Sequence, residues 1–200
     1  MGSEMCIRDS TETGVSKEKS HARVGDSLIL TKPIGTGAVL AAATVGGASA
    51  ESTSFCLDQM DKSNFDAMKI FLDENVSALT DVTGYGLAGH LAEILRASGC
   101  GVSLELNSIP FLLGSPSLVK SGYTSSLQNS NEQVLLDFEL KNGLSMSVPE
   151  LKLLADPQTA GGLLAAIPAE NVSRCVDNLN AVGYACACVG SIEEENWLIR

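Results

Sequence analysis

The sequence predicts an α+β fold in which packed helices cover a mixed β-sheet. Short apolar runs alternate with amphipathic runs along the chain, and glycine-containing bends separate them. The length supports the same fold class, because 200 residues with 44% hydrophobic side chains suffice for one compact domain. The chain has no internal repeat of fixed period, so we do not expect a solenoid or a coiled coil.

The folded domain is predicted to begin after a leader. Residues 1–20 carry charged and small polar side chains without apolar periodicity, and we interpret them as disordered or non-native. The α/β domain is expected over residues 21–200. Its first strand is predicted at Ser27–Thr31, and a glycine turn at Lys32–Gly37 leads into an alanine-rich helix that ends at Thr44.

The next elements repeat this order of strand, bend and helix. Phe65–Leu72 places its large apolar side chains on one helical face, which predicts a second helix. Val76–Val82 is predicted to be a strand that ends at a Thr-Gly-Tyr-Gly bend. After the bend, apolar residues recur at i, i+4, i+7 and i+8 from Leu87, which predicts a helix that stops at Gly99.

The second half of the chain contains longer connections. Gly101–Leu106 is predicted to be a strand, whereas Asn107–Asn131 has the composition of a long connection with room for one short helix. A short helix at Val148–Leu154 precedes a glycine-rich bend and a strand at Leu163–Ile167. An amphipathic helix and a last strand at Tyr184–Ile192 complete the predicted domain.

The composition excludes two classes of partner. The chain has 13 Lys and Arg residues against 24 Asp and Glu residues, a formal net charge of −11, so we do not expect nucleic acid binding. The uncharged stretch Ile34–Ala50 is too short and too rich in Gly, Ala and Thr to span a bilayer. We therefore expect a cytoplasmic protein without a membrane partner.

The cysteines do not indicate a metal cage. Six cysteines are scattered along the chain, without the paired C-x-x-C spacing of a four-ligand zinc site. We expect reduced thiols. Cys186 and Cys188 belong to an apolar run and would face one side of a strand, where we expect buried apolar filler rather than redox chemistry.

Asp81 is the residue whose position most favours metal chemistry. It follows a predicted strand at a glycine-containing bend, where a carboxylate can bind a hard cation such as Mg²⁺ together with substrate phosphates. A turn or helix-cap role fits the same position and is the more frequent one for such a pattern. The spacing alone leaves both interpretations open.

Two glycine turns could bring backbone amides close to phosphate oxygens, because glycine has no Cβ that holds an anion away. Neither has the spacing of a P-loop or of a dinucleotide-binding turn, so a plain tight turn is the alternative. A lysine before the first turn could add a phosphate contact, although a solvated lysine fits as well. The candidate cofactor-binding residues are Lys32, Gly35, Thr36, Gly37, Thr159 and Gly161.

His90 lies at the edge of the apolar stripe of its predicted helix, three residues before Glu93. We expect a packed or hydrogen-bonded histidine rather than a general acid or base. A hydrolase built on His90 would need a nucleophile, and the sequence offers neither a G-x-S-x-G turn nor another candidate.

Three motifs stand out along the chain: Leu30–Gly37 (LTKPIGTG), Thr80–His90 (TDVTGYGLAGH) and Asp156–Leu164 (DPQTAGGLL). Taken together, they resemble the C-terminal half of the selenophosphate synthetase (selenide, water dikinase) family. The resemblance covers about residues 24–192, in the family's order. Tyr85, Ala155 and Ala160 stand where this family commonly has Phe, Cys and Ser.

This resemblance implies the fold of the C-terminal domain of the aminoimidazole ribonucleotide synthetase-like superfamily, whose proteins use ATP and consist of two α/β halves. It implies Mg²⁺ and the conversion of ATP, selenide and water to selenophosphate, AMP and phosphate. Several phosphate oxygens must then be neutralised by divalent ions that carboxylates hold. By the same resemblance, Asp81 is a metal ligand.

The resemblance also implies what a complete enzyme needs besides this chain. The family's reactive Cys or selenocysteine, further metal-binding aspartates and nucleotide-binding residues belong to an N-terminal ATP-binding half that this sequence does not resemble. We therefore expect no catalytic residue here, Cys6 included, activity only together with that half, and a homodimer. The alternatives are a non-catalytic binding or assembly module of the same fold and another ATP-dependent enzyme of the superfamily.

Overall fold

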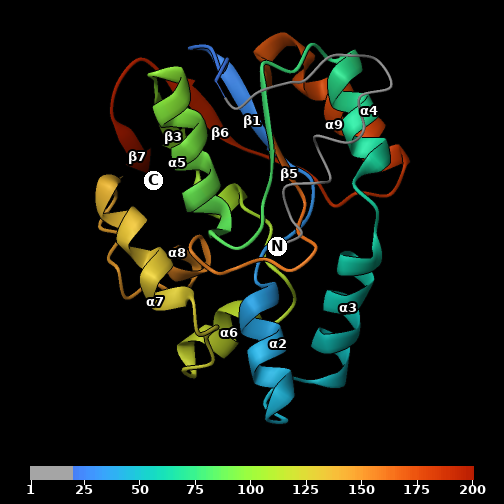
Figure 1. The fold of residues 1–200 in the computed structure, drawn as a ribbon, viewed down its shortest axis with the longest axis vertical. Helices are drawn as coiled ribbons and strands as arrows, with labels where there is room; N and C mark the ends of the chain where they lie inside the picture. The colour runs from blue at the N-terminus through green and yellow to red at the C-terminus, as the bar shows by residue number, and fades with distance from the viewer. Residues whose placement is uncertain (1–19) are drawn as a thin grey trace.

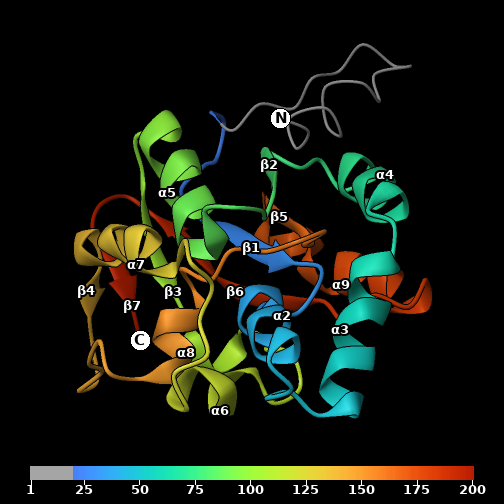
Figure 2. The same cartoon turned by 60° about the horizontal axis from the view of Figure 1, so that its bottom comes forward.

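The structure is a computed structural model that describes residues 20–200. The predicted leader and Cys6 therefore lie outside the described residues, apart from Ser20. Helices pack on both sides of one sheet that contains parallel and antiparallel strand pairs (Figures 1 and 2). The predicted α+β fold with a mixed sheet is confirmed.

The sheet of the described region has seven strands in the order β2-β5-β1-β6-β3-β7-β4. β5 pairs antiparallel with β1 and β2, and β6 pairs antiparallel with β1 and β3. β7 is parallel to both of its neighbours. The strands are β1 (Asp26–Leu30), β2 (Ala78–Asp81), β3 (Gly101–Leu104), β4 (Glu139–Leu140), β5 (Leu163–Pro168), β6 (Ala187–Glu193) and β7 (Trp197–Ile199).

The helices differ widely in length. The 13 residues of α5 make it the longest helix of the described region, and no helix in residues 20–200 is long and apolar enough to cross a bilayer. The α-helices are α2 (Thr36–Thr44), α3 (Ala50–Asp61), α4 (Phe65–Asp73), α5 (Gly86–Ser98), α6 (Ser115–Lys120), α7 (Gln128–Asn131), α8 (Pro149–Leu153) and α9 (Val172–Ala181). The 3-10 segments are η1 (Leu106–Ser108), η2 (Glu132–Asp137) and η3 (Ala169–Asn171).

The two faces of the sheet bury different helices. Leu28 and Leu30 of β1 join a core with the apolar stripe of α5, as predicted from the spacing after Leu87. Ile29 faces the opposite side, because side chains alternate along a strand, and joins a second core with residues of α4 and α9. Figure 1 shows α5 apart from the pair formed by α4 and α9.

Several elements differ from the predictions. α3 was not predicted, because only Ser52 and Cys56 of its residues are buried and its sequence shows no apolar stripe. The strand ending at Ile192 is not the last strand, since β7 follows it. The connection from 107 to 131 contains α6 and α7 as well as part of a 3-10 turn, rather than one short helix. Such short elements depend on tertiary contacts, which local periodicity does not report.

The five described cysteines are free thiols, as predicted. Cys186 is half-buried and packs against the core under α4 and α9, but Cys188 is exposed. The prediction that both are buried filler is therefore wrong for Cys188. Sequence alternation places both residues on one side of a strand, but it does not tell how far a covering helix extends.

Candidate functional site

The three sequence motifs meet where the C-terminal ends of β1 and β2 lie beside the N-terminal end of β5. β1 and β2 both run antiparallel to the strand between them, so their C-terminal ends lie beside the N-terminal end of β5. Hydrogen bonds continue this pairing into the loops: the Thr31 amide donates to Leu163 O at 3.0 Å, and the Val82 amide donates to Gly162 O at 2.9 Å. Residues separated by up to about 130 positions thus form one cluster of loops.

Side chains of the Asp156–Thr159 loop cap the N-terminus of α2. The amides of Gly35 and Thr36 donate to Gln158 Oε1 at 3.0 and 3.2 Å, and the Gly37 amide donates to Asp156 Oδ2 at 2.9 Å. α2 has no side-chain cap from its own N-cap residue, so a distant loop supplies these acceptors. The amides that we predicted to face phosphate are therefore hydrogen-bonded within the domain, and their role in phosphate binding stays a prediction.

Asp156 is the most buried carboxyl group of this cluster, with no exposed surface. Burial raises its pKa to about 6, although the backbone amides of Ala38 and Gly37 and the Gln158 side chain act in the opposite direction. A Cβ at position 37 would lie 2.5 Å from Asp156 Oδ1 and 2.7 Å from Pro157 O. Glycine is therefore required at position 37 by this close approach.

Lys32 is not a solvated lysine, because only 3% of it is exposed. Its ammonium group donates to Lys62 O at 2.6 Å and to Ala160 O at 3.1 Å. Burial, and secondly the neighbouring charge of Lys62, lower the pKa of Lys32 to about 8. In this structure Lys32 joins two loops, and its contact with phosphate stays a prediction.

Thr159 and Gly161 also take part in contacts within the loop cluster. The Thr159 amide donates to Thr36 Oγ1 at 2.8 Å. A Cβ at Gly161 would lie only 2.1 Å from Val82 O, so only glycine allows the two loops to approach this closely. Their phosphate contacts likewise stay predictions.

Asp81 is the last residue of β2, directly before the loop that joins this cluster, and it is half-buried. Within residues 20–200 its carboxylate has no hydrogen bond or ion pair, in contrast to that of Asp156. An oxygen donor of this kind fits a hard cation such as Mg²⁺. The described part of the chain contains no group of three or more His, Cys, Asp or Glu residues that could hold a metal ion, so residues 20–200 do not form a complete metal site around Asp81.

His90 connects the loop after Asp81 to α5. Its Nε2 lies 3.1 Å from Thr83 Oγ1, and its Nδ1 lies 3.0 Å from Glu93 Oε2. Only 5% of His90 is exposed, and the Tyr85 ring covers it with a centroid distance of 5.8 Å. The prediction of a packed or hydrogen-bonded histidine is confirmed, since His90 is both buried and hydrogen-bonded.

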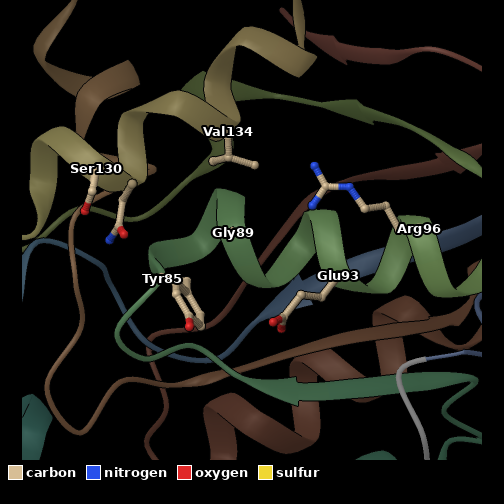
Figure 3. Close-up of a pocket in the computed structure, with 7 residues that line it drawn as sticks. Tyr85, Gly89, Glu93, Arg96, Ser130 and Val134 are labelled. Atoms are coloured by element: carbon tan, nitrogen blue, oxygen red, sulfur yellow. The ribbon is translucent and has the colours of Figure 1, made fainter.

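A shallow groove of about 340 Å³ lies along the outer side of α5 (Figure 3). Tyr85, 63% exposed, lies at one end of it, and Glu93 projects from the same side of the helix. Asn131 fixes the other wall, because its side-chain amide donates to Gly84 O at 2.8 Å and to Ala155 O at 3.1 Å. The groove is lined by Tyr85, Gly89, Glu93, Arg96, Ser130, Asn131 and Val134.

Sequence reasoning missed the residues that hold this cluster together. Asp156 and Gln158 belong to a motif that we noted, but only its glycines and Thr159 were considered for a role. The signal that could have found them is the pair of polar side chains in Asp-Pro-Gln-Thr, which suits backbone capping. Thr83 is the third residue that was missed; its hydrogen-bond partner is His90, seven positions later on α5.

Comparisons with known proteins place the chain in a family. Residues 23–198 match the family described as AIR synthase related protein, C-terminal domain, and the chain belongs to it. Selenide, water dikinase of Pelobacter propionicus is 37% identical over 181 residues, which cover 88% of this chain and 51% of the relative. Selenide, water dikinase of Myxococcus xanthus is 37% identical over 86% of this chain and 49% of the relative. The chain thus spans about half the length of these curated relatives.

Solved structures support the same fold. Thiamine-monophosphate kinase from Stenotrophomonas maltophilia superimposes with a TM-score of 0.64 at 14% identity, over 93% of this chain and 53% of that one. The hydrogenase maturation protein HypE of E. coli gives a TM-score of 0.63 at 16% identity, over 94% of this chain and 49% of that one. At these identities the likeness concerns the fold alone.

Proposed function

We propose that this chain is the C-terminal half of a selenide, water dikinase. Together with an N-terminal ATP-binding half, it would convert ATP, selenide and water to selenophosphate, AMP and phosphate. The observation that carries the proposal is the similarity to proteins of that name at 37% identity over most of this chain. The match to a family defined by a C-terminal domain supports the same division into halves.

Asp81 is the proposed metal ligand of this half. Its carboxylate is half-buried at the end of β2 and has no hydrogen bond or ion pair within the described region, so its oxygens are available to Mg²⁺. Bound Mg²⁺ would neutralise charge on the phosphates of ATP. Because the described residues bring no third acidic or imidazole group to Asp81, the N-terminal half would supply the other ligands.

The remaining residues of the cluster have a supporting part in this proposal. The Lys32 ammonium group and the amides of the glycine turns hold the loops next to Asp81 through hydrogen bonds. We further propose that the predicted set lies close to the phosphates of bound ATP: Lys32, Gly35, Thr36, Gly37, Thr159 and Gly161. The partners of the complete enzyme would be ATP, selenide and a second copy in a homodimer, in the cytoplasm. The net charge of −11 supports the absence of nucleic acid from this set.

The test is AMP formation by this chain mixed with the separately produced N-terminal half of a relative. Selenide-dependent AMP formation by the mixture, and none by either half alone, is the expected result. ATP consumption without selenide would indicate another enzyme of the superfamily. If two folded halves associate and form no AMP, the chain is a non-catalytic module and the proposal is wrong.

A further inference from the structure

Three side chains form a continuous hydrogen-bonded network that begins at Thr83, two residues after Asp81. Thr83, in the bend after β2, contacts His90 Nε2 at 3.1 Å, and His90 Nδ1 contacts Glu93 Oε2 at 3.0 Å. His90 and Glu93 are one turn apart on α5, so the helix holds both in fixed relative positions. This hydrogen-bonded network therefore connects the bend after β2 to helix α5.

Glu93 determines how His90 contacts Thr83. A carboxylate beside Nδ1 favours the imidazole tautomer that carries its proton on that nitrogen. Nε2 then accepts a hydrogen bond from the Thr83 hydroxyl group, which fixes the Thr83 side chain in one orientation. The burial of His90, at 5% exposure, keeps water from competing for this bond.

The backbone of residues 82 and 83, next to Asp81, is hydrogen-bonded to the loop that precedes β5. The Val82 amide donates to Gly162 O at 2.9 Å, and Thr83 O accepts from the Gln158 amide at 2.9 Å. Asp81 itself is paired with Leu163 in the sheet. The bond from Thr83 to His90 is thus the side-chain contact that ties this segment to α5 rather than to β5 and its loop.

We infer that His90 is a positioning residue, which Glu93 orients and which fixes the Asp81–Thr83 segment for cation binding. The inference rests on the proposed role of Asp81 as a metal ligand. The ring nitrogens of His90 contact Thr83 and Glu93, so we assign His90 an indirect role and not that of a metal ligand. Removing a direct partner of a metal ligand weakens metal binding by about tenfold to a hundredfold, and because His90 contacts Thr83 rather than the Asp81 carboxylate we expect the lower end of that range.

The first test measures Mn²⁺ affinity of the mixture of this chain with the N-terminal half, by electron paramagnetic resonance of free Mn²⁺. We expect about tenfold weaker binding for His90→Ala and for Thr83→Val, and unchanged binding for Thr83→Ser, which keeps the hydroxyl group. The double variant should bind no more weakly than either single variant, because both remove the same contact.

A matched control separates positioning from general stability. Ile94→Val removes one methyl group from a buried core residue of the same helix, so we expect a lower melting temperature without any change in the polar contacts of His90. It should leave Mn²⁺ affinity unchanged. If Ile94→Val weakens Mn²⁺ binding as much as His90→Ala, the effect follows stability and the inference is wrong.

The second test uses this chain alone and does not depend on metal. Hydrogen exchange of the Val82 amide, which is bonded to Gly162 O, should be faster in His90→Ala and in Thr83→Val than in Thr83→Ser. Unchanged exchange in all three variants would overturn the inference. Faster exchange together with unchanged Mn²⁺ affinity would also overturn it, since the segment would then move without consequence for the cation.

An Asp81→Asn variant distinguishes this inference from the proposed function. If it abolishes Mn²⁺ binding while His90→Ala and Thr83→Val do not weaken it, the metal ligand stands and only the role of His90 is wrong. If Asp81→Asn leaves Mn²⁺ affinity unchanged, the assignment of Asp81 itself is wrong, and the role of His90 toward the cation is wrong with it.

Discussion

The N-terminus of α2 and the end of β2 are two glycine-containing bends at the same edge of the sheet, yet they differ in how their polar groups are used. At α2 the amides of Gly35, Thr36 and Gly37 all have acceptors from Asp156 and Gln158. At β2 the Asp81 carboxylate has no such contact with the described residues. The first bend thus uses its amides in hydrogen bonds that hold the domain together, whereas the second carries a carboxylate without a hydrogen bond or ion pair in residues 20–200.

The largest expected effect comes from Asp81→Asn. We expect at least a hundredfold loss of Mg²⁺-dependent AMP formation in the mixture of the two halves, because an amide replaces the anionic ligand. The melting temperature should stay within about 1 °C, since the half-buried carboxylate makes no bond that folding needs. Asp73→Asn is the matched control, as this exposed carboxylate at the end of α4 should change neither quantity.

Gly37→Ala tests the internal role of the first bend. The new Cβ would lie 2.5 Å from Asp156 Oδ1 and 2.7 Å from Pro157 O, so the loop must move, and we expect a loss of about 3 kcal/mol in unfolding free energy. Urea denaturation monitored by circular dichroism measures it. Gly84→Ala is the control, because a Cβ there would meet nothing within 4 Å and stability should change by less than about 1 kcal/mol. Equal losses in the two variants would contradict our account of the first bend.

The buried carboxyl group of Asp156 predicts a pH dependence of stability. Its pKa is raised from 3.8 to about 6 in the folded protein, so the folded state binds more protons than the unfolded state between these values. The contribution is therefore fully present below about pH 4 and is lost as the pH rises through 6, by about 2 to 3 kcal/mol.

Comparison with Asp156→Asn isolates this contribution from those of other acids. The difference in unfolding free energy between the wild type and the variant should change by that amount between pH 4 and 7, measured by urea denaturation at each pH. A constant difference across this range would show that Asp156 titrates normally.

The smallest effect is expected for Ala160→Gly, in the loop that contacts Lys32. Ala160 is exposed and has a φ of 50°, a left-handed conformation that costs a residue with a Cβ about 1 kcal/mol. Glycine removes this cost but gains entropy in the unfolded state, so we expect a net stabilisation of about 0.5 kcal/mol in thermal unfolding. Destabilisation would mean that the Ala160 side chain contributes contacts that outweigh the strain.

The elements that the sequence predicted are those with strong local periodicity. The stripe beginning at Leu87 predicted α5 and its buried face, and the apolar run near Leu28 predicted β1. α3 lacked such a stripe, and β7 is only three residues long, so neither could be found from local pattern. Cys188 was misplaced for a related reason, because its exposure depends on which parts of β6 other elements cover.

The candidate site was predicted in part. Asp81 was identified as a strand-end carboxylate and remains the proposed ligand, and His90 was correctly expected to be hydrogen-bonded. The environment of Lys32 was not predicted, because its acceptors are carbonyl groups of residues 62 and 160. No local pattern reports such contacts.

The fold class, most of the strands, helices such as α5 and the three motifs could be predicted from the amino-acid sequence alone, because periodicity and motif identity are local properties. Which polar groups of the two bends are hydrogen-bonded depends instead on contacts between distant segments. The acceptors for the α2 amides lie about 120 residues away along the chain, and they come into reach only when β5 pairs between β1 and β2. That the Asp81 carboxylate has no hydrogen bond or ion pair within residues 20–200 is likewise a property of the folded chain, because the strand pairing that places Asp81 beside Leu163 joins distant parts of the sequence.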